Sequence, residues 1–152
     1  MNFLSKLYFC VFLLLLHLCS ILNANTPPAS SKWLEPFRIT ITNQDVPNVV
    51  VKCNDLEATM LKPGNSTSWK FRRNFWNSNK YSCRFFWVED NMLDVHKVAD
   101  FSVFDVDIVE LCGNYLFTMN RCYWYVTRDG FYFCKNNDNI NDWNKMHEWT
   151  NI

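Results

Sequence analysis

The sequence has no excess of charge of either sign. Its 152 residues include 15 lysines and arginines and 15 aspartates and glutamates. Proteins that attract nucleic acid or anionic membranes by their overall field usually carry a basic excess. The composition therefore gives no electrostatic case for either partner, and we predict neither.

The sequence also lacks the spacings that mark common metal and catalytic sites. It contains no Cys-x-x-Cys pair, no Cys/His spacing typical of zinc and no Gly-x-Ser-x-Gly nucleophile setting. Asp94 and His96 lie two residues apart, which alone is weak evidence for a catalytic pair, and we expect His96 and His147 in solvated loops. Asp105 and Asp107 alternate as on the polar face of a strand, without the glycine-bounded loop of a calcium site. We predict no catalytic residue, no metal and no other cofactor.

Long apolar runs are confined to the amino terminus. Lys6 precedes the apolar run from Leu7 to Leu16, and a more polar stretch follows as far as Ala24. This order is typical of a secretory signal peptide cleaved after Ala24. The run is shorter than the roughly 20 apolar residues of a membrane span. We therefore predict that residues 1–24 are removed and that the mature protein is secreted, without membrane insertion.

The remaining chain has the length of one domain. Removal of 24 residues from 152 leaves 128. Residues 25–35 are rich in proline and serine and are predicted to form a flexible leader, residues 36–143 the folded domain, and residues 144–152 a C-terminal tail. The polar, asparagine-rich stretch from residue 135 onward is expected to be irregular.

Short runs of alternating apolar residues recur through the domain. Phe37, Ile39 and Ile41 alternate with polar residues, which is the period of a half-buried strand. Further strands are predicted at 49–51, 69–71, 81–88, 101–109, 121–128 and 131–134. No stretch of comparable length shows a sustained helical period. The predicted fold is all-β, a small antiparallel β-sandwich stabilised by disulfides.

The Asp129-Gly130 dipeptide predicts a hairpin. This pair tolerates the positive φ angles of a type I′ turn, whose twist matches that of paired strands. A two-residue loop at this dipeptide pairs residue 128 with 131, 126 with 133 and 125 with 134. Residues Cys122, Trp124, Val126, Phe131 and Phe133 then share one face, which we assign to the core. Residues Tyr123, Tyr125, Tyr132 and Cys134 share the other, and a register slip of one residue would exchange the two faces.

The outward tyrosines allow two interpretations. Tyr123, Tyr125 and Tyr132, joined by Phe86, could form an exposed aromatic stripe that binds a protein partner, because aromatic residues are enriched at binding hot spots. Alternatively, the C-terminal tail covers them through Trp143 or Trp149.

An N-glycosylation sequence follows a predicted turn. Asn65-Ser66-Thr67 comes directly after Pro63-Gly64. A glycan on an exposed turn disturbs no packing, so we predict modification of Asn65.

The ordered set of strands resembles the plant self-incompatibility protein S1 family, also called S-protein homologs. The resemblance covers about residues 37–143, and the segments that carry it are Ile39-Thr40-Ile41-Thr42-Asn43, Val51-Lys52-Cys53, Leu61-Lys62-Pro63-Gly64, Trp69-Lys70-Phe71, Tyr81 to Trp87, Cys122-Tyr123-Trp124-Tyr125-Val126 and Asp129-Gly130-Phe131-Tyr132. It implies a secreted β-sandwich ligand with two disulfides from four recurrent cysteines. Founding members of the family are pistil proteins that trigger rejection of self pollen through a pollen-side receptor.

The cysteines that match the family pattern are Cys53, Cys83, Cys112 and Cys122. An oxidising compartment makes disulfides the expected state, but four cysteines allow three pairings and the sequence selects none of them. Cys134 is left over, either as a shielded thiol, which we favour, or as a link between two chains.

The function implied by the resemblance is that of a small extracellular recognition ligand, not an enzyme. Its partner is expected to be a cell-surface receptor protein, and the chain is expected to act as a monomer. The alternative is a secreted carbohydrate-binding protein or small hydrolase, with tyrosines and tryptophans, Tyr123 and Tyr125 among them, stacking on sugars.

Overall fold

A computed structural model describes residues 35–74, 79–89, 94–113, 118–135 and 142–152. The chain divides into two units, Met1–Ser31 and Lys32–Ile152, and the fold described below is that of the second. The predicted signal peptide, and all of the predicted leader except Glu35, lie outside the described residues.

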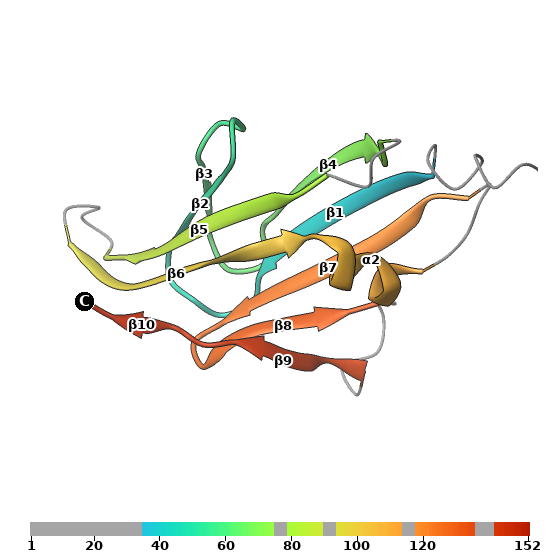
Figure 1. Cartoon of the computed structure of the whole chain (residues 1–152). Helices are drawn as coiled ribbons and strands as arrows, with labels where there is room; N and C mark the ends of the chain where they lie inside the picture. Colours follow the sequence, from blue (N-terminus) through green and yellow to red (C-terminus); the bar gives the residue numbers. More distant parts are fainter. Residues whose placement is uncertain (1–34, 75–78, 90–93, 114–117, 136–141) are drawn as a thin grey trace, which may run out of the picture. The chain divides into compact units, whose positions relative to one another are not determined.

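Two five-stranded sheets make up the domain (Figure 1). Sheet A has the strand order β4-β1-β7-β8-β9, and sheet B has the order β10-β6-β5-β2-β3. The elements are β1 (Pro36–Asn43), β2 (Val49–Cys53), β3 (Thr59–Leu61), β4 (Ser66–Arg72), β5 (Tyr81–Val88), β6 (Val95–Phe104), α2 (Val106–Cys112), β7 (Asn120–Thr127), β8 (Gly130–Cys134), β9 (Asn144–His147) and β10 (Thr150–Asn151). The predicted fold class, an all-β sandwich with two disulfides, is confirmed.

The pairing within the sheets is antiparallel except at β1 and β7. These strands run parallel, with Ile39 beside Cys122 and Ile41 beside Trp124. β1 also pairs antiparallel with β4, so it is a central strand of sheet A. The purely antiparallel sandwich expected from the sequence is corrected at this one ladder.

The core lies between the inner faces of the two sheets. Phe37, Ile39 and Ile41 are fully buried, as their alternation predicts. Trp124 of sheet A donates a hydrogen bond from Nε1 to the carbonyl oxygen of Val103 in sheet B, at 2.9 Å. This bond satisfies the indole N–H of a fully buried tryptophan and connects the two layers.

The predicted strand over residues 101–109 is wrong in its second half. β6 ends at Phe104, and the chain turns into α2. Asp105 is the helix N-cap, and its Oδ1 accepts hydrogen bonds from the backbone N–H groups of Asp107 and Ile108, each at 3.1 Å. Asp105 and Asp107 therefore cap and begin a helix instead of forming the polar face of a strand.

The β7–β8 hairpin forms in a register different from the predicted one. Its loop residues are Arg128 and Asp129, and Thr127 pairs with Gly130. Neither loop residue has a positive φ, whereas Gly130 has φ of 147°, so the predicted type I′ turn is wrong. The loop is held by the segment between β1 and β2, where Asp45 accepts a hydrogen bond from the backbone N–H of Arg128 at 2.9 Å.

The predicted faces of this hairpin are nevertheless correct. The register differs from the predicted one by two residues, and an even shift leaves every side chain on its face. The core cluster contains Cys122, Trp124, Val126, Phe131 and Phe133. The cluster on the other face contains Tyr123, Tyr125, Tyr132 and Cys134.

The predicted irregular tail also differs in the structure. Residues 144–147 form β9, which pairs with β8, and residues 150–151 form β10, which pairs with β6. The end of the chain thus provides an edge strand to each sheet. Its polar composition did not indicate strands. These strands form because β8 and β6 offer backbone hydrogen-bonding partners at their edges, which the composition of the tail does not reveal.

Candidate binding surfaces

The four cysteines expected from the resemblance form two disulfides. Cys53 and Cys83 are direct partners on β2 and β5, with Cα atoms 4.0 Å apart. Cys112 and Cys122 connect the end of α2 to β7, with Cα atoms 4.9 Å apart. The structure thereby selects one of the three pairings that the sequence leaves open. The bonds hold the middle of sheet B and the entry to β7 in place.

The tyrosines of β7 do not form an exposed stripe. Tyr123 and Tyr125 retain only 9% and 4% of their accessible surface. The Trp143 ring stacks on Tyr125 with ring centroids 4.2 Å apart, and lies 6.0 Å from the Tyr132 ring. The structure therefore agrees with the second interpretation, in which the C-terminal tail covers the tyrosines. Trp143 is the residue that covers them.

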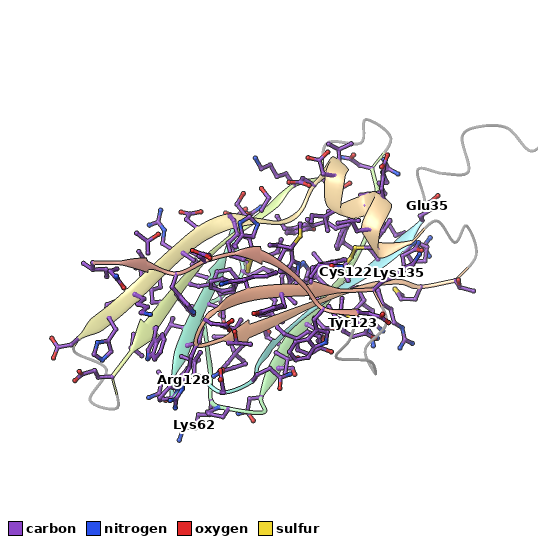
Figure 2. The ribbon with its side chains drawn as sticks, turned by 90° about the horizontal axis from the view of Figure 1, so that it is seen from below. Glu35, Lys62, Cys122, Tyr123, Arg128 and Lys135 are labelled. Atoms are coloured by element: carbon purple, nitrogen blue, oxygen red, sulfur yellow. A yellow bond between two sulfur atoms is a disulfide. The ribbon has the colours of Figure 1, made fainter. Side chains whose placement is uncertain are left out.

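Cys134 belongs to the same covered cluster. It takes part in neither disulfide and is buried beside Tyr123 and Tyr125. Its register partner on β7 is Tyr123, which is labelled in Figure 2. The position corresponds to the shielded thiol and not to an accessible link between chains.

Phe86 lies on sheet B, whereas the tyrosines lie on sheet A, so the predicted stripe that joins Phe86 to the tyrosines is wrong. It is half-buried on the outer face of β5, between its register partners Val50 on β2 and Val98 on β6. Met60 of β3 extends this apolar row as the partner of Val50. We call these four residues, Met60, Val50, Phe86 and Val98, the Phe86 row.

Charged side chains lie directly beside the Phe86 row. Lys52, Arg84 and Asp100 are register partners across β2, β5 and β6, two residues away from the row. Arg84 and Asp100 form an exposed ion pair with Nη2 and Oδ2 3.0 Å apart. A shallow hollow of about 350 Å³ runs along this face, and its lining residues are Lys52, Asn54, Ser82, Cys83, Arg84, Phe86 and Asp100.

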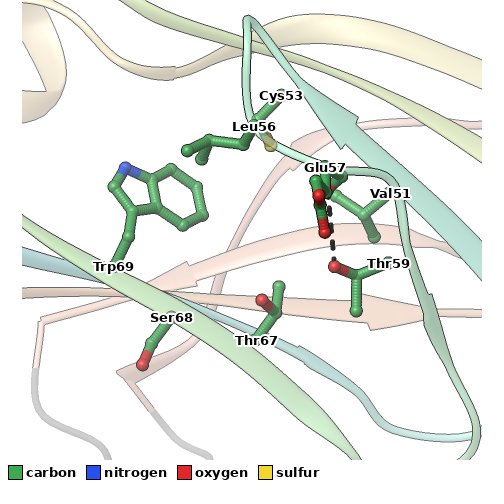
Figure 3. Close-up of a pocket in the computed structure, with 8 residues that line it drawn as sticks. All are labelled: Val51, Cys53, Leu56, Glu57, Thr59, Thr67, Ser68 and Trp69. Carbon is green, nitrogen blue, oxygen red and sulfur yellow. Dashed lines mark hydrogen bonds between the residues drawn. The ribbon is translucent and has the colours of Figure 1, made fainter.

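A smaller cleft lies between the edges of the two sheets (Figure 3). Trp69 of β4 lies on one side, and Glu57 and Thr59 lie on the other. The cleft measures about 200 Å³, below the range of roughly 300–1,000 Å³ of pockets that enclose small ligands. Its size fits a single inserted side chain better than an enclosed substrate.

The histidines do not form the pairs considered from the sequence. His96 lies at the start of β6, and its Nε2 is 2.9 Å from Oε1 of Glu89, not paired with Asp94. His147 is half-buried in β9 and stacks on Phe101 with ring centroids 3.9 Å apart, so the predicted solvated loop is wrong for both. Burial lowers the pKa of His147, while the charge of Asp105 acts in the opposite direction.

The described residues hold neither a candidate metal cluster nor a candidate membrane-spanning helix. No group of three or more histidine, cysteine, aspartate or glutamate side chains is placed to hold a metal ion in this part of the chain. None of the described helical segments has the length and apolar character of a membrane span.

Asn65 lies where the predicted turn places it. The backbone N–H of Asn65 donates to the carbonyl oxygen of Lys62 at 2.9 Å, and Gly64 between them has φ of 81°. The Asn65 side chain is exposed. Its glycosylation stays a prediction, which a mobility shift of the secreted protein on deglycosylation would test.

The structure thus defines a class of protein, a small disulfide-bonded β-sandwich with broad accessible sheet faces. The chain belongs to the plant self-incompatibility protein S1 family, whose model matches residues 38–149. Two disulfides are typical of proteins that mature in the oxidising secretory route. The chain is accordingly a secreted member of this family.

Two known proteins illustrate the similarity. The chain is 29% identical over 99 residues to S-protein homolog 2 of Arabidopsis thaliana, and the match covers 64% of this chain and 55% of that relative. The chain therefore spans about half the length of this curated relative. A solved structure of SPH (self-incompatibility protein homologue) proteins, described as small, highly stable, secreted proteins from plants, has 13% identity and a TM-score of 0.49. That match covers 76% of this chain and 96% of the solved one.

Proposed function

We propose that this protein is an extracellular recognition ligand of the self-incompatibility type, which binds a cell-surface receptor protein through the outer face of sheet B. Rejection of self pollen, or a related form of cell–cell signalling, is the process in which such a ligand would act. Membership of the S1 family supports the general role. The observation that carries the proposed surface is the Phe86 row, an apolar strip across four strands with charged residues beside it.

The composition of this face fits a protein partner. Protein interfaces commonly have an aromatic anchor at the centre and a polar rim that excludes water around it. Phe86 would be the anchor, and Lys52 together with the Arg84–Asp100 pair would form the rim. We therefore expect the receptor to present an apolar segment with an acidic residue opposite Lys52.

The backbone beneath this face is held rigidly. The Cys53–Cys83 disulfide joins the two strands that carry Lys52 and Arg84. Binding to a preorganised surface loses less conformational entropy than binding to a mobile one. The disulfide-bonded sheet is thus suited to recognition without rearrangement.

Catalysis and sugar stacking have weaker support. The S1 family is not a known enzyme family, and we propose that this member acts by binding alone. The carbohydrate alternative relied on tyrosines and tryptophans as a stacking platform, with Tyr123 and Tyr125 as the residues that a substitution would test. Both rings are buried beneath or beside Trp143, so that platform is covered.

The test is proximity labelling of living pollen or other plant cells with the purified secreted protein. We expect a membrane protein to be labelled by the wild-type chain, and its binding to weaken about 30-fold in Phe86→Ala, the effect of losing a hot spot of about 2 kcal/mol. Leu111→Ala is the matched control, because Leu111 is an exposed apolar residue on α2, 44% accessible.

Two results would contradict the proposal. One is labelling of wall polysaccharide alone, with no membrane protein. The other is equal binding by wild type and Phe86→Ala when thermal unfolding shows that both are folded.

A further inference from the structure

Three cationic side chains form a row across the outer face of sheet A. Arg38 of β1 is the register partner of Lys70 on β4 and also of Arg121 on β7. Register partners in a sheet share a face, and this face points away from the core, because Phe37 and Ile39 on either side of Arg38 are buried. Lys70 and Arg121 are exposed and Arg38 is partly buried. We call Lys70, Arg38 and Arg121 the basic row.

The basic row is unfavourable for the fold by itself. Like charges directly opposite one another on neighbouring strands destabilise a sheet. Within the described residues, no ion pair joins any of the three to a carboxylate. In addition, Nε of Arg38 is buried and has no hydrogen-bond partner among the residues that the structure describes. Because the three cations repel one another and one N–H donor is unsatisfied, the row has the properties of an anion-binding site.

Hydroxyl groups lie next to the basic row on the same face. Ser68, Thr40 and Tyr123 are register partners across the same three strands, two residues along from the cations. Arg121 donates from Nη1 to the Tyr123 hydroxyl at 3.5 Å. The face therefore offers a line of cations and a parallel line of hydroxyl groups.

We propose that this face binds an acidic polysaccharide, a chain of uronate sugars that lies across β4, β1 and β7. Neighbouring strands are about 4.8 Å apart, so the three cations extend across roughly 10 Å of the face and can meet more than one carboxylate of an extended polymer. The sugar hydroxyls then exchange hydrogen bonds with Ser68 and Thr40. A lipid surface fits less well, because membrane-binding faces place large apolar residues beside their cations, and here the neighbouring row is polar.

This proposal does not depend on the receptor. The basic row lies on sheet A and the Phe86 row on sheet B, so the two surfaces can be altered separately. Failure of either test leaves the other unaffected.

The test measures binding of the full secreted protein to polygalacturonate by titration calorimetry at low and high salt. We expect binding that weakens with salt, since exposed charges are screened, and little binding to the methyl-esterified polymer, which lacks the charge. The exposed pair Lys70→Gln and Arg121→Gln, combined, should weaken binding at least about tenfold. Lys62→Gln with Lys80→Gln removes two positive charges from exposed residues outside the basic row and should leave binding within about twofold of wild type.

Several outcomes would overturn the proposal. Equal binding by K70Q/R121Q and wild type, or no binding at all, would exclude the site. Binding to polyglutamate or to phosphatidylserine vesicles that matches or exceeds binding to polygalacturonate would exclude the ligand class.

Discussion

Gly130 illustrates what a single residue contributes to this fold. Its φ of 147° lies in a region that side chains other than glycine rarely adopt. A Cβ atom at this position would lie 2.5 Å from the carbonyl oxygen of His147 and 2.8 Å from Cε of Lys145. Gly130 therefore permits both the turn after Asp129 and the close approach of β9.

We predict that Gly130→Ala lowers the free energy of unfolding by about 3 kcal/mol or more, because backbone strain and overpacking add. Gly64→Ala is the matched control. Gly64 also has a positive φ, of 81°, but an added Cβ would meet nothing within 4 Å, so only the strain of about 1–2 kcal/mol applies. Urea unfolding followed by tryptophan fluorescence measures both, and equal costs would refute the close approach of β9.

At the same scale, the Asp129-Gly130 dipeptide predicted a hairpin but not its register. The positive φ belongs to Gly130 alone, and the loop is Arg128-Asp129. The interaction with Asp45 helps to set this register. Asp45 is far away in the sequence, so no local pattern could reveal it.

At the scale of elements, β9 shows how a polar segment becomes part of the sandwich. It pairs with β8 and places His147 on the Phe101 ring, with centroids 3.9 Å apart. Trp124 lies 5.9 Å from the same imidazole. This aromatic setting takes the imidazole out of water and lowers its pKa, the charge of Asp105 opposing the shift.

The lowered pKa of His147 predicts acid sensitivity. In the pH interval between the lowered folded value and the ordinary value of 6.5, the unfolded chain binds more protons than the folded one. Stability contributed by neutral His147 is therefore complete above 6.5 and is lost as the pH falls through the folded pKa. Urea midpoints measured from about pH 7 to about pH 5 should decline in wild type and decline less in His147→Phe. An identical slope in H147F would refute the prediction.

At the scale of the whole molecule, the two disulfides lower the conformational entropy of the unfolded chain by different amounts. They close segments with sequence separations of 30 and 10 residues. In the chain-entropy account, these correspond to about 4 and about 3 kcal/mol, against a total stability of roughly 5–15 kcal/mol for a domain of this kind.

We therefore predict that Cys53→Ala with Cys83→Ala is the more destabilising of the two double substitutions. Cys112→Ala with Cys122→Ala serves as its counterpart, and thermal unfolding of both against wild type measures the difference. The reverse order would show that strain or local packing, not loop length, governs the contribution of these bonds.

At the same scale, the position of the charges matters as well as their sum. The totals of 15 cationic and 15 anionic residues cancel, which is why composition gave no case for an anionic partner. The register of β4, β1 and β7 nevertheless brings Lys70, Arg38 and Arg121 into one row. A sum over the chain cannot reveal a local accumulation of charge.

The sequence by itself determined the fold class, the inward faces of β1, β7 and β8, and the family. Alternation states which residues of one strand share a face, and the ordered motifs extend through most of the domain. Only the tertiary structure decided that Cys53 pairs with Cys83, that Trp143 covers Tyr125, that Phe86 lies on the opposite sheet from the tyrosines, and that three cations meet on sheet A. The physical reason is that these features depend on which strands become neighbours, and neighbouring strands are selected by contacts between segments far apart in the chain.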